Sequence, residues 1–180
     1  MVWAIFNQNQ GSALEEIDNS AASDRVVAIV GGAILDESLK RALEQRFRTN
    51  TNVVDKTFKV SGPLGNLVPK IDIGYLLYMF EKDMRDALYG ISTIRNEFAH
   101  NLIATFDSKS AKLNDAMGKL ILHIGRDFYP NPFNRGQDSE YAIDSPKTQR
   151  EVFMVNLKIC LIRLLEDAGY HVPWTNIAIG

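Results

Sequence analysis

The fold class depends on DRVVAIVGGAILDESLKRALEQRFR, residues 24–48. Two interpretations of this stretch compete. In the first, the apolar run at 26–30 is a buried strand and Gly31-Gly32 begins a phosphate-binding loop. In the second, the whole stretch is one amphipathic helix, because its apolar residues recur at steps of three and four. These residues are Val27, Val30, Ile34, Leu35, Leu39, Ala42, Leu43 and Phe47.

The helical interpretation is favoured. Neither glycine-rich phosphate motif, G-x-G-x-x-G or G-x-x-x-x-G-K-[ST], is present, and Ser23 is a suitable N-cap just before the stretch. Each glycine inside a helix costs roughly 1 kcal/mol relative to alanine. We therefore predict that another helix crosses closely at Gly31 and Gly32.

Further helical patterns follow outward from this stretch. Residues 67–80 are apolar on nearly every side, which predicts a central helix. From about 81 to 102 apolar residues form a stripe on one side of a predicted helix, and this stripe should face the core. Helices are also expected at about 107–124 and 148–168. Segments 61–66, 129–147 and 170–180 are predicted to be irregular. The stripe consists of Met84, Leu88, Ile91, Ile94, Phe98 and Leu102.

No strand-like alternation is convincing anywhere in the 180 residues. We predict a single all-α domain over 1–180, a bundle of about five to seven helices.

The composition narrows the class of protein. Hydrophobic residues make up 46% and charged residues 23%, and the formal net charge is -2. Domains that hold nucleic acid by phosphate neutralisation alone are usually basic, so specific DNA binding is not favoured. No run approaches the roughly 18 apolar residues of a membrane span, and no signal peptide is recognisable. The expectation is a cytoplasmic protein with a buried, unpaired thiol at Cys160.

No metal or cofactor site is predicted. The three histidines, His100, His123 and His171, form no H-x3-H or H-E-x-x-H pair, which are the usual zinc-ligand spacings. The nucleophile motif G-x-S-x-G is also missing.

The densest polar chemistry lies within residues 94–101, where Arg95, Asn96 and His100 share a turn and a half. One interpretation is metal-independent cleavage of RNA, with His100 as general acid or base, Arg95 stabilising the phosphorane charge and Asn96 orienting either group. The other is structural, with Arg95 pairing with a carboxylate such as Asp72 while the other two bond the helix end. On a helical wheel Arg95 leans toward the core and lies about 140° from His100.

Four further polar residues are predicted to be structural. Lys70 and Asp72 fall inside the apolar 67–80 pattern, so burial with a charged or hydrogen-bonding partner is expected. Asp36 and Glu37 lie in mid-helix, where an ion pair or a solvated face is favoured over a catalytic acid/base pair.

Three blocks carry a resemblance to a known family. They are DRVVAIV with LDESL at 24–39, GPL at 62–64 with KIDIGY at 70–75, and IRNEFAH at 94–100. Together, over 24–102, they resemble the mannitol operon repressor (MtlR-like) family. The resemblance implies a bacterial regulator, with a protein partner favoured over operator DNA.

The last of these blocks is also similar to the R-x4–6-H motif of HEPN domains, which are all-α and commonly dimeric. Many of those domains are metal-independent ribonucleases. The similarity implies a HEPN-like fold and a homodimer. It leaves open an RNA-cleaving site at Arg95, Asn96 and His100, although a non-enzymatic regulator is favoured.

Overall fold

The computed structural model describes residues 7–47, 51–122 and 146–169, and these residues form seven helices and no strand. The helices are α1 (Gln8–Asp18), α2 (Asp24–Arg46), α3 (Thr51–Phe58), α4 (Leu67–Leu76), α5 (Lys82–His100), α6 (Ala111–Gly118) and α7 (Gln149–Asp167). The predicted all-α class is confirmed.

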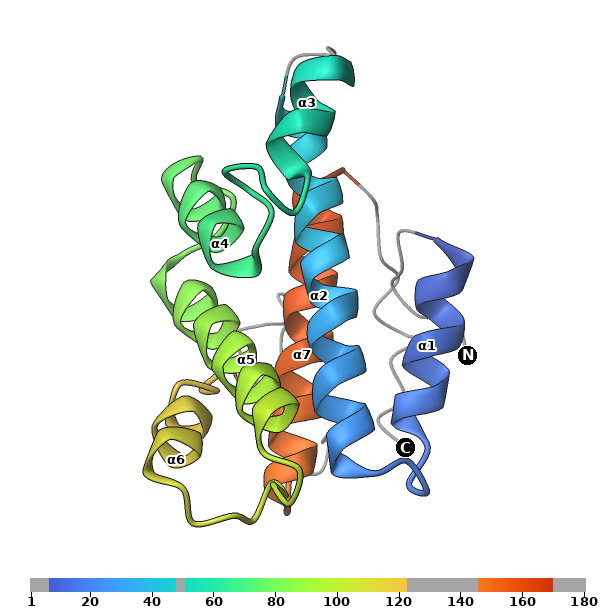
Figure 1. Cartoon of the computed structure of the whole chain (residues 1–180), viewed down its shortest axis with the longest axis vertical. Coiled ribbons are helices and arrows are strands. Elements are labelled where there is room, and N and C mark those ends of the chain that lie inside the picture. Colours follow the sequence, from blue (N-terminus) through green and yellow to red (C-terminus); the bar gives the residue numbers. More distant parts are fainter. Residues whose placement is uncertain (1–6, 48–50, 123–145, 170–180) are drawn as a thin grey trace, which may run out of the picture.

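Helix α2 is the centre of the bundle and packs against α1, α4, α5 and α7 (Figure 1). Helix α7 runs parallel to it, because Arg150 pairs with Asp24 at one end and Arg46 pairs with Asp167 at the other. Helix α5 is antiparallel, since Arg25 near the start of α2 reaches the last turn of α5. Helix α6 covers the outer side of α5.

The predicted close crossing at the paired glycines is confirmed, and it occurs on two sides of α2. A Cβ added to Gly31 would lie 2.8 Å from Leu157 Cδ2 of α7. A Cβ added to Gly32 would lie 2.5 Å from Arg95 Cγ of α5. The absence of two side chains thus lets three helices pack at one level, which offsets the low helix propensity of glycine.

Side-chain caps begin two of the three helices of this crossing, α2 and α7. The Ser23 side chain accepts a hydrogen bond from Val26 N at 3.3 Å. Thr148 and Glu151 form a reciprocal capping box at the start of α7, as their spacing allows. In the core, the ring of Phe106 lies between those of Phe98 and Phe153, with centroids 4.9 and 5.1 Å away.

The predicted central helix at 67–80 is wrong in length and position. Helix α4 ends at Leu76, and Leu76 and Tyr78 are 67% and 93% exposed. The ring of Phe80 folds back against Gly74, where an added Cβ would meet it at 2.8 Å. The chain therefore reverses beside α4, which lies at one end of the α2–α5 pair (Figure 1).

Three other boundaries differ from the prediction. Leu102 follows the last turn of α5, so it leaves the buried stripe and is 80% exposed. Helix α6 is capped by Ser110 and ends at Gly118, so it is shorter than the 107–124 pattern. Residues 129–145, the tail 170–180, His123 and His171 lie outside the described residues.

The thiol of Cys160 is buried, as predicted, and burial raises its pKa to about 12. Among the described helices, none is both long and apolar enough to cross a membrane.

Candidate functional site on helix α5

The two ends of the R-x4-H motif are exposed on α5. Arg95 Nη1 donates a hydrogen bond to Asn96 Oδ1 at 2.9 Å, and both Arg95 and His100 are exposed. The prediction that Arg95 leans toward the core is wrong for its guanidinium. Only its stem is packed, with Cβ and Cγ lying over Gly32 of α2.

The side chain of His100 makes no hydrogen bond or ion pair within the part of the chain that the structure describes. Arg95 bonds Asn96, not Asp72 or Glu37. The structure therefore does not join Arg95 to His100 within one subunit, and it does not neutralise Arg95 with a carboxylate among the described residues.

The structural role predicted for this motif was to bond the end of its helix. Arg25 performs that role instead. Arg25 Nη2 donates to Ala99 O and Nη1 to Asn101 O, both at 3.3 Å. These carbonyls belong to the end of α5, where backbone acceptors lack helical partners. Sequence reasoning missed Arg25, because its target lies more than seventy residues away in the chain.

Beside the motif, Glu97 is half-buried and pairs with Lys112 of α6 at 3.3 Å. This ion pair attaches α6 to the same helix that carries Arg95 and His100. Glu97 therefore fastens the neighbouring helix and is not directed at the exposed Arg95–Asn96 pair.

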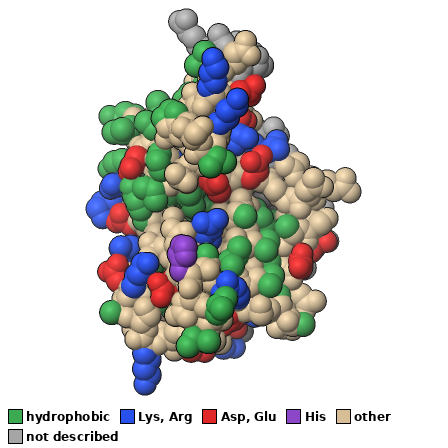
Figure 2. All heavy atoms as spheres, viewed as in Figure 1, with side chains coloured by type: hydrophobic (Ala, Val, Ile, Leu, Met, Phe, Trp, Pro, Cys, Tyr) green, Lys and Arg blue, Asp and Glu red, His purple; other side chains and the backbone are tan. Residues whose placement is uncertain are grey.

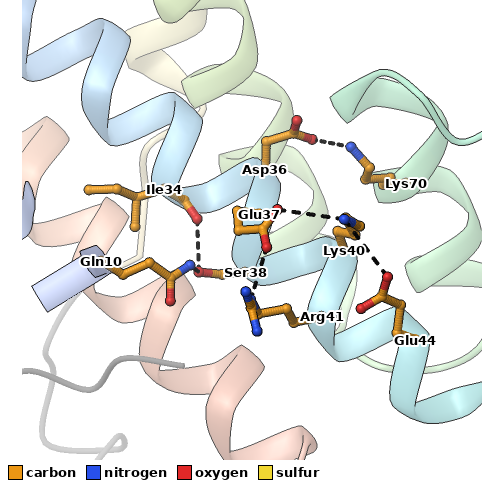
Figure 3. A network of polar contacts seen from close by, with 9 residues as sticks. All are labelled: Gln10, Ile34, Asp36, Glu37, Ser38, Lys40, Arg41, Glu44 and Lys70. Carbon is orange, nitrogen blue, oxygen red and sulfur yellow. Dashed lines mark hydrogen bonds and ion pairs between the residues drawn. The ribbon is translucent and has the colours of Figure 1, made fainter. Parts of the chain in front are cut away.

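The predicted ionic residues of α2 form two separate sets of ion pairs, one around Asp36 and one around Glu37 (Figure 3). Lys70 Nζ of α4 lies 2.5 Å from Asp36 Oδ1, and the Lys70 side chain is only 3% exposed. Glu37 pairs with Arg41 at 2.9 Å and with Lys40 at 3.9 Å. Of these residues only Lys70 is buried, since Asp36 and Glu37 both keep contact with solvent. Both carboxylates pair with cations, which is the arrangement that the ion-pair interpretation expects.

Asp72 has the partners that were expected but not the burial. It is half-exposed, accepts a hydrogen bond from Tyr89 Oη at 2.5 Å, and lies 3.8 Å from Arg85. The Arg85 guanidinium lies 4.9 Å above the Tyr75 ring and 5.3 Å above the Tyr89 ring. Burial, and then the Asp72 carboxylate, raise the pKa of the Tyr89 hydroxyl. This cluster joins α4 to α5.

Two surface hollows lie away from the R-x4-H motif. One, of about 480 Å³, is lined by Phe106, Asp107, Ser108, Lys109, Asn114, Met117, Gly118 and Gln149. The other, of about 490 Å³, is lined by Met79, Phe80, Glu81, Asp83, Met84, Arg163, Glu166 and Asp167. Neither includes Arg95 or His100. Within 7–47, 51–122 and 146–169, no three His, Cys, Asp or Glu side chains are grouped to hold a metal ion.

The close packing over Gly32 gives a direct test of how Arg95 is positioned. We expect Gly32→Ala to lower the free energy of unfolding by about 1 kcal/mol, because overpacking outweighs the gain in helix propensity. Gly118→Ala is the matched control, since nothing lies within 4 Å of its added Cβ, and it should be neutral or stabilising. Urea unfolding followed by circular dichroism measures both. Equal effects at the two glycines would contradict the close crossing.

The fold so described is an all-α helical bundle built around one central helix. It is similar to a chain in the X-ray structure of the MtlR–HPr complex from Escherichia coli, with a TM-score of 0.56 and 18% sequence identity. The alignment covers 91% of this chain and 100% of that chain. No family model matches the sequence, and no curated protein matches it. The chain therefore has an MtlR-like fold, as the sequence resemblance implied, while the HEPN-type motif stays a prediction.

Proposed function

We propose that this protein is a cytoplasmic bacterial regulator of the mannitol operon repressor type, acting as a homodimer through contact with another protein. One observation carries the proposal. Its fold is shared over nearly the whole chain with a chain that was crystallised in complex with the protein HPr. Regulation by binding another protein is therefore the function that the fold supports best.

The surface supports a protein partner over a nucleic acid. Acidic and basic side chains alternate over the face seen in Figure 2, with hydrophobic side chains between them. The net charge of -2 also gives little attraction for a polyanion. Exposed apolar patches rimmed by polar residues are typical of protein interaction sites.

The test is affinity capture with the full chain as bait in a lysate of its own cells, followed by reconstitution of the purified pair. We expect one partner to co-elute with the dimer in a fixed ratio in size-exclusion chromatography with light scattering. A bait that retains the same proteins as an untagged control would contradict the proposal. A monomeric mass would contradict the dimer alone.

Metal-independent ribonuclease activity is the second candidate. It is favoured by the exposure of both Arg95 and His100 and by the freedom of Arg95 from any carboxylate among the described residues. A second subunit would have to complete such a site, because the two side chains are not paired within one chain. Single-stranded RNA incubated with the protein in EDTA tests this candidate. Cleavage lost in both Arg95→Ala and His100→Ala supports it, and intact RNA with folded protein excludes it.

A further inference from the structure

Two consecutive aliphatic side chains are exposed just after α5. Leu102 is 80% exposed and Ile103 is 87% exposed. Exposed apolar residues are usually scattered singly over a protein surface, so an adjacent pair that is almost fully exposed is less usual. Both residues belong to the turn that follows Asn101, the C-cap of α5. We refer to Leu102 and Ile103 as the α5 turn.

Hydrogen bonds hold the backbone around the α5 turn in place. Within the turn, the Asn101 side chain accepts a hydrogen bond from Ile103 N at 3.3 Å. From α2, Arg25 donates to Asn101 O at 3.3 Å. Just beyond the turn, Asp24 Oδ2 accepts from Phe106 N at 3.1 Å. The two exposed side chains are therefore presented by an anchored backbone, which lowers the conformational entropy that binding to another molecule would cost.

Three basic side chains belong to the same end of the α2–α5 pair, and none of them meets a carboxylate among the described residues. Arg25 donates to two backbone carbonyls at the end of α5. Arg95 donates to the side chain of Asn96. His100 has no hydrogen-bond or ion-pair partner in the described structure. In Figure 2, His100 is the purple side chain, and basic and hydrophobic side chains lie on the same face.

Two carboxylates near the turn are already paired with other cations. Glu97 lies 3.3 Å from Lys112 of α6, and Asp24 lies 3.4 Å from Arg150 of α7. These two ion pairs leave the three basic side chains without a counter-charge from either carboxylate. Both the Arg95 guanidinium and the His100 imidazole are exposed and can donate hydrogen bonds. An acidic group brought by another molecule would complement them.

We propose that the α5 turn, Arg95 and His100 form a docking surface for a segment of a partner protein that carries aspartate or glutamate beside an apolar side chain. The apolar side chain packs on Leu102 and Ile103, and the carboxylates pair with the basic side chains. This inference rests on the proposed function in taking the partner to be a protein, and it adds the chemistry of the partner's contact segment.

Two other occupants fit this surface less well. A nucleic acid also carries negative charge, but its unpaired bases stack on aromatic rings, whereas Leu102 and Ile103 are aliphatic. Among the large apolar side chains exposed in the described residues, only Tyr78 is aromatic, and it precedes α5 while the turn follows α5. A second copy of the chain is disfavoured because a twofold contact would bring the same basic surface against itself.

A methyl-labelling experiment tests the surface directly. The full chain is labelled with 13C at the isoleucine δ1 methyl groups, and Ile103→Val identifies the Ile103 signal. A short helical peptide of leucine and glutamate is then added, and a matched peptide has lysine in place of glutamate. We expect the acidic peptide to shift the Ile103 signal and to leave that of Ile121, which is 53% exposed after α6, unchanged. The basic peptide should shift neither signal.

Variants identify the groups responsible. Arg95→Glu keeps the Cβ and Cγ atoms that pack over Gly32 but reverses the charge. It should weaken binding of the acidic peptide about fivefold and strengthen binding of the basic one. Leu102→Ser should also weaken binding of the acidic peptide about fivefold, as expected for an apolar anchor.

The matched controls are Lys59→Glu and Val60→Ser, because these two residues are a basic and an aliphatic side chain exposed together after α3. Both control variants should bind the acidic peptide as the unaltered chain does. All four variants should keep the unfolding midpoint measured by circular dichroism, because the altered groups are exposed. A loss of binding without a loss of stability separates docking from a structural role.

The outcomes separate this inference from the proposed function. Equal shifts with the basic peptide, or an Ile103 signal that responds to neither peptide, would overturn the inference. An Ile103 signal that moves with protein concentration alone, or equally with single-stranded RNA, would assign the surface to a second copy or to a nucleic acid, and either result overturns it. A captured partner that binds Arg95→Glu and Leu102→Ser normally would overturn the inference and leave the proposed function standing. Peptide results as expected, without any captured partner, would support the surface and contradict the proposed function.

Discussion

Phe98→Ala is expected to lower the free energy of unfolding by about 4 kcal/mol, within the usual range for a fully buried phenylalanine. The Phe98 side chain is 0% exposed, and its ring lies 4.9 Å from that of Phe106. Phe106 in turn packs on Phe153 of α7. Truncation therefore leaves a cavity where α5, α7 and the chain after α5 meet. Urea unfolding followed by circular dichroism measures the change.

Leu102→Ala is the matched control for this prediction. Leu102 belongs to the same helical stripe in the sequence, yet it is 80% exposed. Its truncation should change the free energy of unfolding by no more than about 0.5 kcal/mol, as for most surface substitutions. A loss at Leu102 as large as that at Phe98 would show that the stripe continues beyond His100, contrary to the structure.

Asp36→Ala is expected to lower the free energy of unfolding by about 2 kcal/mol. It removes the carboxylate 2.5 Å from Lys70 Nζ, while the Lys70 side chain stays 3% exposed. Loss of one partner from a fully buried pair costs about 3–5 kcal/mol. The smaller value applies here because Asp36 is 38% exposed, so water replaces part of the lost interaction. The same unfolding measurement applies.

Two further variants make this prediction specific. Adding Lys70→Met to Asp36→Ala should recover most of the lost stability, because no buried charge then lacks a partner. Glu37→Ala is the neighbouring control, since among the described residues Glu37 pairs only with partly exposed Lys40 and Arg41 and such pairs contribute about 0–1 kcal/mol. A loss at Glu37 matching that at Asp36 would mean that burial of Lys70 is not the cause.

Some features of the candidate site could be predicted from the sequence and others could not. The motif of Arg95, Asn96 and His100 could be located in the sequence, and it lies on a helix as predicted, although this helix ends at His100. The direction of the Arg95 guanidinium could not be derived from a helical wheel. The Cβ and Cγ of Arg95 pack over Gly32 of α2, which has no side chain. The direction of the Arg95 side chain therefore depends on the crossing of α2 and α5. The role of Arg25 was missed for the same reason, since it caps a helix distant in the sequence.

The exposure of the end of α4 depends almost entirely on tertiary structure. Residues 67–80 are as apolar as a core helix, and their composition predicts burial. Only the reversal at Tyr78 and the return of Phe80 onto Gly74 place Leu76 and Leu77 outside. The carboxylates that line the second hollow come from Glu81, Asp83, Glu166 and Asp167, and only the packing of α5 on α7 brings them together.

The sequence by itself determined the helical class, the capped beginning of α2, the buried stripe of α5, and the need for helices to cross at Gly31 and Gly32. These features follow from local propensity and from a periodicity that burial of apolar surface enforces. The tertiary structure alone decided which apolar segment stays outside, which charges meet, and whether Arg95 faces the core. Those outcomes depend on where helices end and how they pack, and such contacts join residues far apart in the chain.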